Sequence, residues 1–206
     1  MAIELGFIVE GHCEYESIPS IVSKVYGFCN FPIVNAKGIG NIIRNTGDEL
    51  LYLIKTYSPR KIIISLDYKE AEKEGIVENC IQLKELVTNN CDIFIQSQKN
   101  GSLNLPEEII VVIADKTYES WICADYENLK NNELFDCEKI TETFTNVDLE
   151  IPNPGSWLKS KLSKDIDMKS RAYRKKVSKT LRPEFAAEKS RSFRKFLKEI
   201  SNINIA

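Results

Sequence analysis

The sequence predicts an α/β protein in which helices flank a mainly parallel β-sheet, followed by a basic helical extension. Up to about residue 125, short apolar runs rich in β-branched residues alternate with longer segments whose apolar residues recur at helical spacing. This alternation favours a parallel sheet with helices on its faces. Beyond residue 130 the strand-like runs stop, and basic segments of helical character begin at Ser156.

The first part of the chain contains three predicted strands separated by two predicted helices. The strands are the apolar runs 2–9, 31–36 and 61–66. We expect the first helix around residues 18–25, with Pro19 near its first turn. The second helix opens at Gly38 and continues through Ile54.

The next part of the chain continues the alternation and then changes character. The predicted elements are a helix over 70–90, strands at 92–96 and 108–114, and a helix over 117–125. A loop rich in proline at 151–155 marks the only plausible boundary, between an α/β domain of residues 1–150 and a basic extension of residues 151–206. Pro183 is expected to interrupt the helices of that extension.

Composition indicates one compact intracellular protein. The 206 residues, of which 43% are hydrophobic, can bury a core of ordinary size. Six cysteines are scattered without a Cys-x-x-Cys pair, and there is one histidine, so structural zinc is not expected and the thiols should be reduced. The sequence shows neither a signal peptide nor an apolar run of about 20 residues, which predicts a cytoplasmic protein without a membrane span.

The formal net charge of −2 hides a strong asymmetry along the chain. Residues 1–158 contain 13 basic and 25 acidic residues, whereas residues 159–198 contain 15 basic and 4 acidic residues. A basic block of this kind suits contact with a polyanion such as DNA or RNA. The alternative is that the basic extension docks on the acidic body by charge complementarity.

Two of the predicted strands end on an acid, at Glu10 and at Asp67. The carboxyl ends of parallel strands meet at one edge of a sheet, and α/β sheets bind their ligands there. Gly11 allows a tight turn that would return Glu14 to the same crevice from the start of the following helix. Three such carboxylates would bind a hard divalent cation such as Mg²⁺ or Mn²⁺. The alternative is that these acids cap helices and face solvent.

Glu119 is a further candidate metal ligand, because it follows the predicted strand 108–114 closely and would lie near the same sheet edge. Asp125 comes six residues later and would face another side of the helix. The alternative role of Glu119 is that of a carboxylate stabilised by the dipole at a helix N-terminus. We expect Trp121 to pack in the core and His12 to be solvated in its turn.

These residues resemble the TOPRIM fold of topoisomerases, primases and OLD-type nucleases. The resemblance begins with Val9-Glu10-Gly11-x-x-Glu14 and with Leu66-Asp67 after an isoleucine-rich strand. Three further segments are similar to a bacterial TOPRIM-like family of unknown function, domain of unknown function 4276. They are Tyr118-Glu119-Ser120-Trp121-Ile122-Cys123-Ala124-Asp125, Tyr173-x-Lys175, and Pro183-Glu184-Phe185-Ala186 with Arg191-Ser192-Phe193-Arg194-Lys195-Phe196. The resemblance extends from the first strand to about residue 198.

The resemblance implies that Glu10 is a metal ligand or a general acid and base, and that Asp67 is one aspartate of an Asp-x-Asp motif. The chain departs from that motif, since the partner position holds either Ser65 or Lys69. The resemblance further implies Mg²⁺- or Mn²⁺-dependent cleavage of DNA or RNA. Its OLD-type relatives suggest an ATPase partner and a role in defence against phage.

Basic residues are predicted to contact nucleic acid through its phosphates, without reading base sequence. In the extension they are Arg171, Arg174, Lys175, Lys176, Lys179, Arg182, Arg191 and Arg194. Lys69 could hold a phosphate as a point charge. The apolar residues Phe185, Phe193, Phe196 and Leu197 are expected to anchor the helices to the body.

The sequence therefore predicts a TOPRIM-type, metal-dependent nuclease in which Glu10, Glu14 and Asp67 act on the phosphodiester. The alternative is a catalytically degenerate nucleic-acid-binding or regulatory subunit, because one carboxylate of the motif is missing. Nucleotide binding through other folds is disfavoured. The segment Gly38-Ile39-Gly40 lacks the third glycine of a dinucleotide fingerprint, and no Gly-x-x-x-x-Gly-Lys-Ser/Thr sequence occurs.

Overall fold

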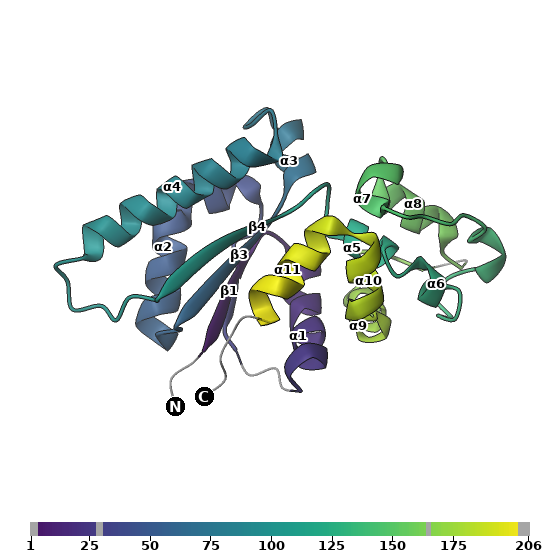
Figure 1. Cartoon of the computed structure of the whole chain (residues 1–206), viewed down its shortest axis with the longest axis horizontal. Coiled ribbons are helices and arrows are strands. Elements are labelled where there is room, and N and C mark those ends of the chain that lie inside the picture. Colours follow the sequence, from purple (N-terminus) through teal and green to yellow (C-terminus); the bar gives the residue numbers. More distant parts are fainter. Residues whose placement is uncertain (1–3, 28–30, 164–165, 202–206) are drawn as a thin grey trace. The chain divides into compact units, whose positions relative to one another are not determined.

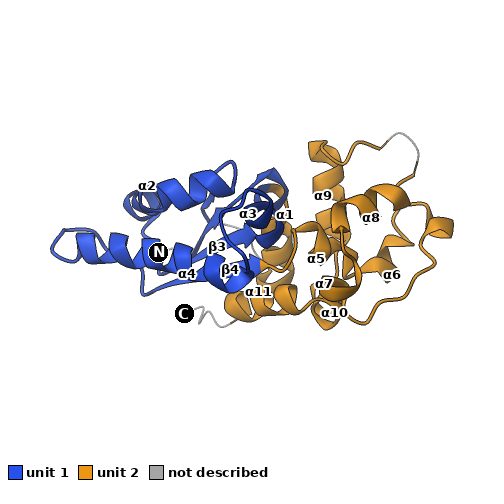
Figure 2. Ribbon diagram, turned by 90° about the horizontal axis from the view of Figure 1, so that it is seen from above, with its two compact units in different colours: residues 1–15, 30–113, 203–206 blue, residues 16–29, 114–202 orange. Residues whose placement is uncertain are grey.

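The computed structural model describes residues 4–27, 31–163 and 166–201, and its elements are labelled in Figure 1. The chain divides into two compact units (Figure 2). The described residues of unit 1 are 4–15 and 31–113, and those of unit 2 are 16–27, 114–163 and 166–201. The predicted boundary near residue 150 falls inside unit 2. Unit 1 is built on a β-sheet, whereas unit 2 is helical.

Four parallel strands form one sheet in the order β2-β1-β3-β4. Their bounds are β1 Leu5–Val9, β2 Ile33–Asn35, β3 Lys61–Asp67 and β4 Glu108–Ala114. In the centre of the sheet Phe7 of β1 pairs with Ile33 of β2 and with Ile63 of β3. The chain runs outward from β1 to β2 and then crosses back to β3, so the direction of strand addition reverses between β1 and β3.

The sheet forms around its two central strands, β1 and β3, whose apolar residues are buried on both faces, as is typical of parallel strands. On one face, residues of the helices α2 (Ile39–Tyr57) and α4 (Cys80–Gln98) join those of the strands in one apolar core. Leu50 of α2, Val87 of α4 and Ile64 of β3 are fully buried there. A short helix, α3 (Tyr68–Lys73), follows β3 directly.

The structure corrects two of the predicted elements and confirms β4 at its predicted bounds. The strand predicted at 92–96 is wrong, because α4 continues to Gln98. Phe94 extends the buried stripe of Leu83, Val87 and Cys91 along that helix, which is helical rather than strand periodicity. Pro19 lies in the middle of α1 (His12–Tyr26) rather than in its first turn.

Unit 2 contains residues 16–26 of α1 and a set of short helices. Their bounds are α5 Glu119–Cys123, α6 Tyr126–Leu129, the 3₁₀ helix η1 Cys137–Lys139, α7 Val147–Glu150, α8 Pro154–Lys161, α9 Arg171–Thr180, α10 Pro183–Lys189 and α11 Arg191–Ser201. The predicted break near Pro183 is confirmed, since α10 begins there. None of the described helices is both long and apolar enough to cross a lipid bilayer.

Trp121 organises the core of unit 2, as expected. Its ring stacks on Phe196 with the centroids 4.9 Å apart and lies 5.2 Å from the centroid of Phe193. The indole Nε1 donates a hydrogen bond to Ser192 Oγ at 3.0 Å. The expectation that Phe185 is an anchor is wrong, because its ring is exposed and lies 4.1 Å from the Arg182 guanidinium.

Helix α1 supplies the C-terminal cap of α9 within unit 2. Lys24 Nζ donates hydrogen bonds to the carbonyls of Ser178 at 3.3 Å and Lys179 at 2.6 Å, and also to that of Leu181. These carbonyls lie at the end of a helix, where backbone acceptors lack intrahelical partners and a cation is favoured. Partial burial lowers the pKa of Lys24, which the charge of Asp125 opposes.

A candidate carboxylate site at the sheet edge

Glu10 follows β1 directly and reaches the end of β3. Its carboxylate Oε2 accepts a hydrogen bond from the backbone N–H of Asp67 at 3.0 Å. Its backbone carbonyl accepts one from Gly38 N at 2.8 Å, which fixes the chain where the loop after β2 passes. Glu10 is only 7% exposed, so its carboxylate is held rather than solvated freely. The structure therefore brings the two acid-ended strands together at one edge of the sheet.

The topology of the sheet independently marks this edge. In open α/β sheets, ligands bind outside the carboxyl ends of the strands, at the point where strand addition reverses direction. In the order β2-β1-β3-β4 that point lies between β1 and β3. Glu10 directly follows β1, and Asp67 is the last residue of β3. The two acids thus stand at the position where this class of sheet binds its ligands.

Asp67 ends its strand half-buried and is also the residue before α3. Its side chain does not cap that helix, so the helix-capping alternative does not describe it. The two positions that could complete an Asp-x-Asp motif differ in their surroundings. Ser65 is buried in β3, whereas Lys69 is exposed on α3 and forms an ion pair with Glu72 at 2.6 Å.

Glu14 lies in the first turn of α1, with its carboxylate close to Gly11. Glu14 is 4% exposed, and its Oε2 lies 3.3 Å from the position that a Cβ on residue 11 would take. A side chain at position 11 would therefore press against the carboxylate. In the first turn of α1 the helix dipole favours a negative side chain. Glu10, Glu14 and Asp67 together are called the carboxylate site below.

Asn35 is a polar residue of the same edge that the sequence did not single out. It is the last residue of β2, and its Oδ1 accepts a hydrogen bond from Lys37 N at 2.9 Å. Because this bond identifies the oxygen of the Asn35 amide, the other amide atom is the nitrogen Nδ2. Nδ2 lies 3.2 Å from His12 Nδ1. An amide nitrogen can only donate, so His12 Nδ1 accepts and the ring carries its proton on Nε2. The sequence feature that could have identified Asn35 is its position at the end of β2, the strand next to β1, after which Glu10 follows.

Mg²⁺ is usually bound by one or two carboxylates, with water and substrate phosphates completing the octahedron. The carboxylate site fits this donor set with Glu10 and Asp67. Among the residues that the structure describes, no group of three or more histidine, cysteine or acidic side chains is arranged to hold a metal ion. Any cation bound here would thus rely on water and on the substrate for most of its ligands.

Glu119 and Asp125, the other acids considered, belong to unit 2. Glu119 begins α5 and is half-buried, as a carboxylate at a helix N-terminus can be. Asp125 accepts hydrogen bonds from Arg182 Nη2 at 2.6 Å, from Nε at 3.0 Å and from the Arg182 backbone N–H at 2.8 Å. Burial raises the pKa of Asp125, and the hydrogen bonds and charge of Arg182 oppose that rise.

The basic residues of α9 and Arg182 are largely engaged inside unit 2. Arg171 and Lys175 pair with Glu16, at 2.8 and 3.8 Å, and Lys176 pairs with Glu133. Arg174 donates to the carbonyl of Lys169. Lys179 is exposed, as are Arg191 and Arg194 of α11. The charge-complementarity alternative thus describes most of α9 and Arg182.

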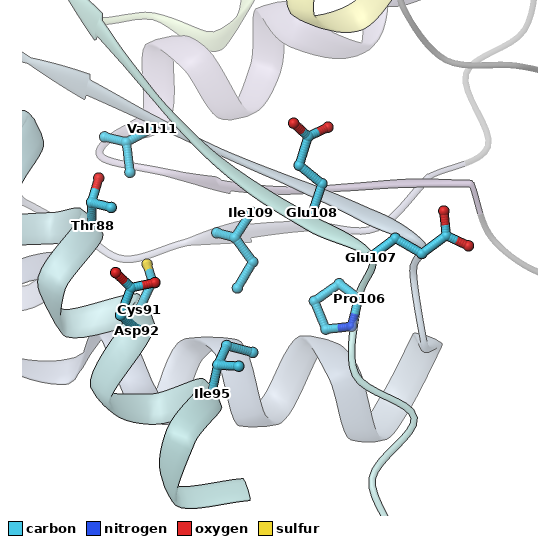
Figure 3. A pocket seen from close by; sticks show the side chains of 9 residues that line it. All are labelled: Thr88, Cys91, Asp92, Ile95, Pro106, Glu107, Glu108, Ile109 and Val111. Atoms are coloured by element: carbon cyan, nitrogen blue, oxygen red, sulfur yellow. The ribbon is translucent and has the colours of Figure 1, made fainter. Parts of the chain in front are cut away.

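A small pocket of unit 1 lies between α4 and β4 (Figure 3). Its lining residues are Thr88, Cys91, Asp92, Ile95, Pro106, Glu107, Glu108, Ile109 and Val111. Its volume of about 150 Å³ is below the roughly 300 Å³ at which ligand pockets begin. Burial raises the pKa of the Cys91 thiol to about 12, so this cysteine is not a nucleophile. None of the predicted site residues lines the pocket.

Comparison of the chain with models of protein families, with curated proteins and with solved structures identifies no relative. The chain has an α/β fold with a four-stranded parallel sheet flanked by helices, and a helical C-terminal region.

Proposed function

We propose that this protein is a TOPRIM-like, divalent-metal-dependent phosphodiesterase that cleaves DNA or RNA at the carboxylate site. One observation carries the proposal: the Glu10 carboxylate accepts the Asp67 N–H at 3.0 Å, at the switch point of a parallel sheet. The motif resemblance of Glu10, Glu14 and Asp67 supports the same assignment. The reaction class follows from the residue types, because paired carboxylates and a hard cation serve phosphoryl chemistry.

A bound Mg²⁺ or Mn²⁺ would polarise the phosphodiester and favour departure of the leaving oxygen. Glu10 and Asp67 are the residues that would hold it. The Asp67 amide fixes one oxygen of the Glu10 carboxylate through a charge-assisted hydrogen bond. The Glu14 carboxylate lies close to Gly11, the residue after Glu10, and its negative charge would add to the attraction for a cation.

The test compares cleavage by the wild type, Glu10→Gln and Asp67→Asn. Plasmid DNA, single-stranded DNA and RNA are incubated with Mg²⁺, with Mn²⁺ or with EDTA. We expect metal-dependent cleavage that falls at least about 100-fold in both variants, the loss typical of removing one catalytic group. Glu85→Gln and Asp92→Asn are matched controls, because both acids are exposed on α4.

The two controls should cleave like the wild type. Cleavage that survives in both Glu10→Gln and Asp67→Asn, or that persists in EDTA, would refute the assignment. Circular dichroism of every variant separates lost chemistry from lost folding.

A second function is favoured by the residues on either side of Asp67. Where an Asp-x-Asp motif has a second aspartate, this chain has buried Ser65 or exposed Lys69, which is already paired with Glu72. A protein with one motif carboxylate fewer could bind nucleic acid without cutting it. Salt-sensitive binding by the wild type, together with no cleavage under any metal condition, would support this function instead.

A further inference from the structure

Helix α11 carries an amphipathic pattern with an unusually uniform basic side. Arg191, Arg194, Lys195 and Lys198 are all exposed. At about 100° per residue, these four positions fall within an arc of about 100° on the helix surface. At about 1.5 Å of rise per residue they extend over about 10 Å. These four residues are called the α11 basic stripe.

Three residues of the stripe differ in their partners from Arg171, Lys175 and Lys176 of α9. In the part of the chain that the structure describes, no carboxylate forms an ion pair with Arg191, Arg194 or Lys198. Arg191 acts on Asp115 only at longer range. Arg194 gives one Nη1 hydrogen bond to the carbonyl of Ala187 at 3.2 Å, and a guanidinium has five donors. Arg191, Arg194 and Lys198 therefore retain charge that no ion pair among the described residues neutralises.

The opposite side of α11 shows which kind of polyanion suits the stripe. Phe193, Phe196 and Ile200 are fully buried in the structure, and the first two pack against Trp121. A helix that binds a lipid surface places its apolar side in the membrane. Because that side of α11 is occupied, contact can occur only through the charged side. Phosphates repeated along a nucleic-acid strand match such a contact.

We propose that the α11 basic stripe is the surface that binds the sugar-phosphate backbone of a nucleic-acid strand, and that α9 is not. The inference rests on the proposed function for the identity of the polyanion and narrows it to one helix. Arg171 and Lys175 of α9 pair with Glu16, whose negative charge offsets theirs and weakens their attraction for a phosphate. Within the described residues, Arg191, Arg194 and Lys198 have no such carboxylate partner.

The test uses two double variants that remove the same charge. Arg194→Gln/Lys198→Gln alters the stripe, and Arg171→Gln/Lys175→Gln is the matched control on α9. Binding of a fluorescent single-stranded oligonucleotide is measured by anisotropy between about 50 and 300 mM salt. EDTA is present throughout, so the measurement does not depend on catalysis. Thermal denaturation checks that each variant is folded.

We expect the stripe variant to bind more weakly and its slope of log Kobs against log salt to shrink by about 1.4. That value is two lost phosphate contacts at about 0.7 each for a single strand. The α9 control should keep the wild-type slope. An equal decrease in both double variants would overturn the proposal, because net charge alone would then explain it. A wild type that binds no oligonucleotide would also overturn it.

Two further measurements distinguish lipid binding from nucleic-acid binding, and failure of this inference from failure of the proposed function. Binding to vesicles containing phosphatidylserine, lost in the stripe variant and without oligonucleotide binding, would assign the stripe to lipid and overturn the proposal. Glu85→Gln, the exposed control on α4, should bind oligonucleotide like the wild type. If the stripe variant binds normally while Glu10→Gln abolishes cleavage, this inference fails and the proposed function stands. If the stripe variant loses binding as expected but no nucleic acid is cleaved, the proposed cleavage fails and this inference stands.

Discussion

Replacing Arg182 tests whether this basic residue serves unit 2 rather than a nucleic acid. The Asp125 side chain is 1% exposed and that of Arg182 is 35% exposed. Arg182→Gln keeps the backbone N–H that bonds Asp125 but removes the guanidinium, leaving a buried carboxylate without its counter-charge. Removing one partner of a buried ion pair costs about 3–5 kcal/mol. Because Arg182 is partly solvated, we expect the lower end, about 3 kcal/mol.

Urea unfolding and thermal denaturation followed by circular dichroism measure this loss. For a chain of this size, 3 kcal/mol corresponds to a decrease in Tm of about 6–12 °C. The pH dependence is a second readout. Burial already raises the pKa of Asp125, and without Arg182 to oppose it that pKa rises further.

A carboxyl group whose folded pKa lies above its unfolded value of about 3.9 adds stability below that value and loses it as the pH rises through the folded pKa. The deficit of Arg182→Gln relative to the wild type should therefore shrink as the pH falls from 7 towards 4. Lys179→Gln removes an exposed charge from the same tail and should change the free energy of unfolding by no more than about 0.5 kcal/mol. The reasoning is refuted if Arg182→Gln unfolds like the wild type while losing affinity for nucleic acid.

Two other predictions concern unit 1. Gly11→Ala should destabilise the protein by about 1 kcal/mol in urea unfolding, because its Cβ would lie 3.3 Å from Glu14 Oε2. The same change should cost little in a Glu14→Ala background, and an equal cost there would contradict the contact. Because the pKa of Cys91 is about 12, iodoacetamide at pH 8 should leave this thiol unmodified in the native protein while exposed Cys137 reacts. Peptide mass spectrometry reads both sites, and fast labelling of Cys91 would show that it is not buried.

The parallel sheet and its acid-ended strands could be predicted from local sequence. Buried parallel strands are continuous β-branched runs, and β4 shows this so clearly that its bounds were predicted correctly. Residues 92–96 were wrongly predicted as a strand because three apolar residues, at positions 93–95, follow one another there. Ile93 is 69% exposed on α4, and only Phe94 belongs to the buried stripe. Burial, which local sequence does not reveal, decides between the two interpretations.

The fate of the basic residues could not be predicted, because their partners are distant in the sequence. Glu16 and Glu133 have no local feature that marks them as partners of α9. Likewise, Asp125 sits in a segment that resembles a family motif, yet its carboxylate is turned to Arg182. Charge counting identified a basic tail, but which of its charges are neutralised depends on tertiary structure. The α11 basic stripe can be distinguished from the other basic residues of the tail only once these ion pairs are known.

Unit 2 is discontinuous, since it combines part of α1 with residues that follow β4. During synthesis, Glu16 and Lys24 leave the ribosome long before the arginine and the carbonyls that they will meet in α9. A nascent or prematurely terminated chain that stops before Arg171 would contain this part of α1 without the residues of α9 that it contacts. Expression of residues 114–202 alone would have the opposite defect. Deletion experiments on either end of this protein should therefore disturb the other end as well.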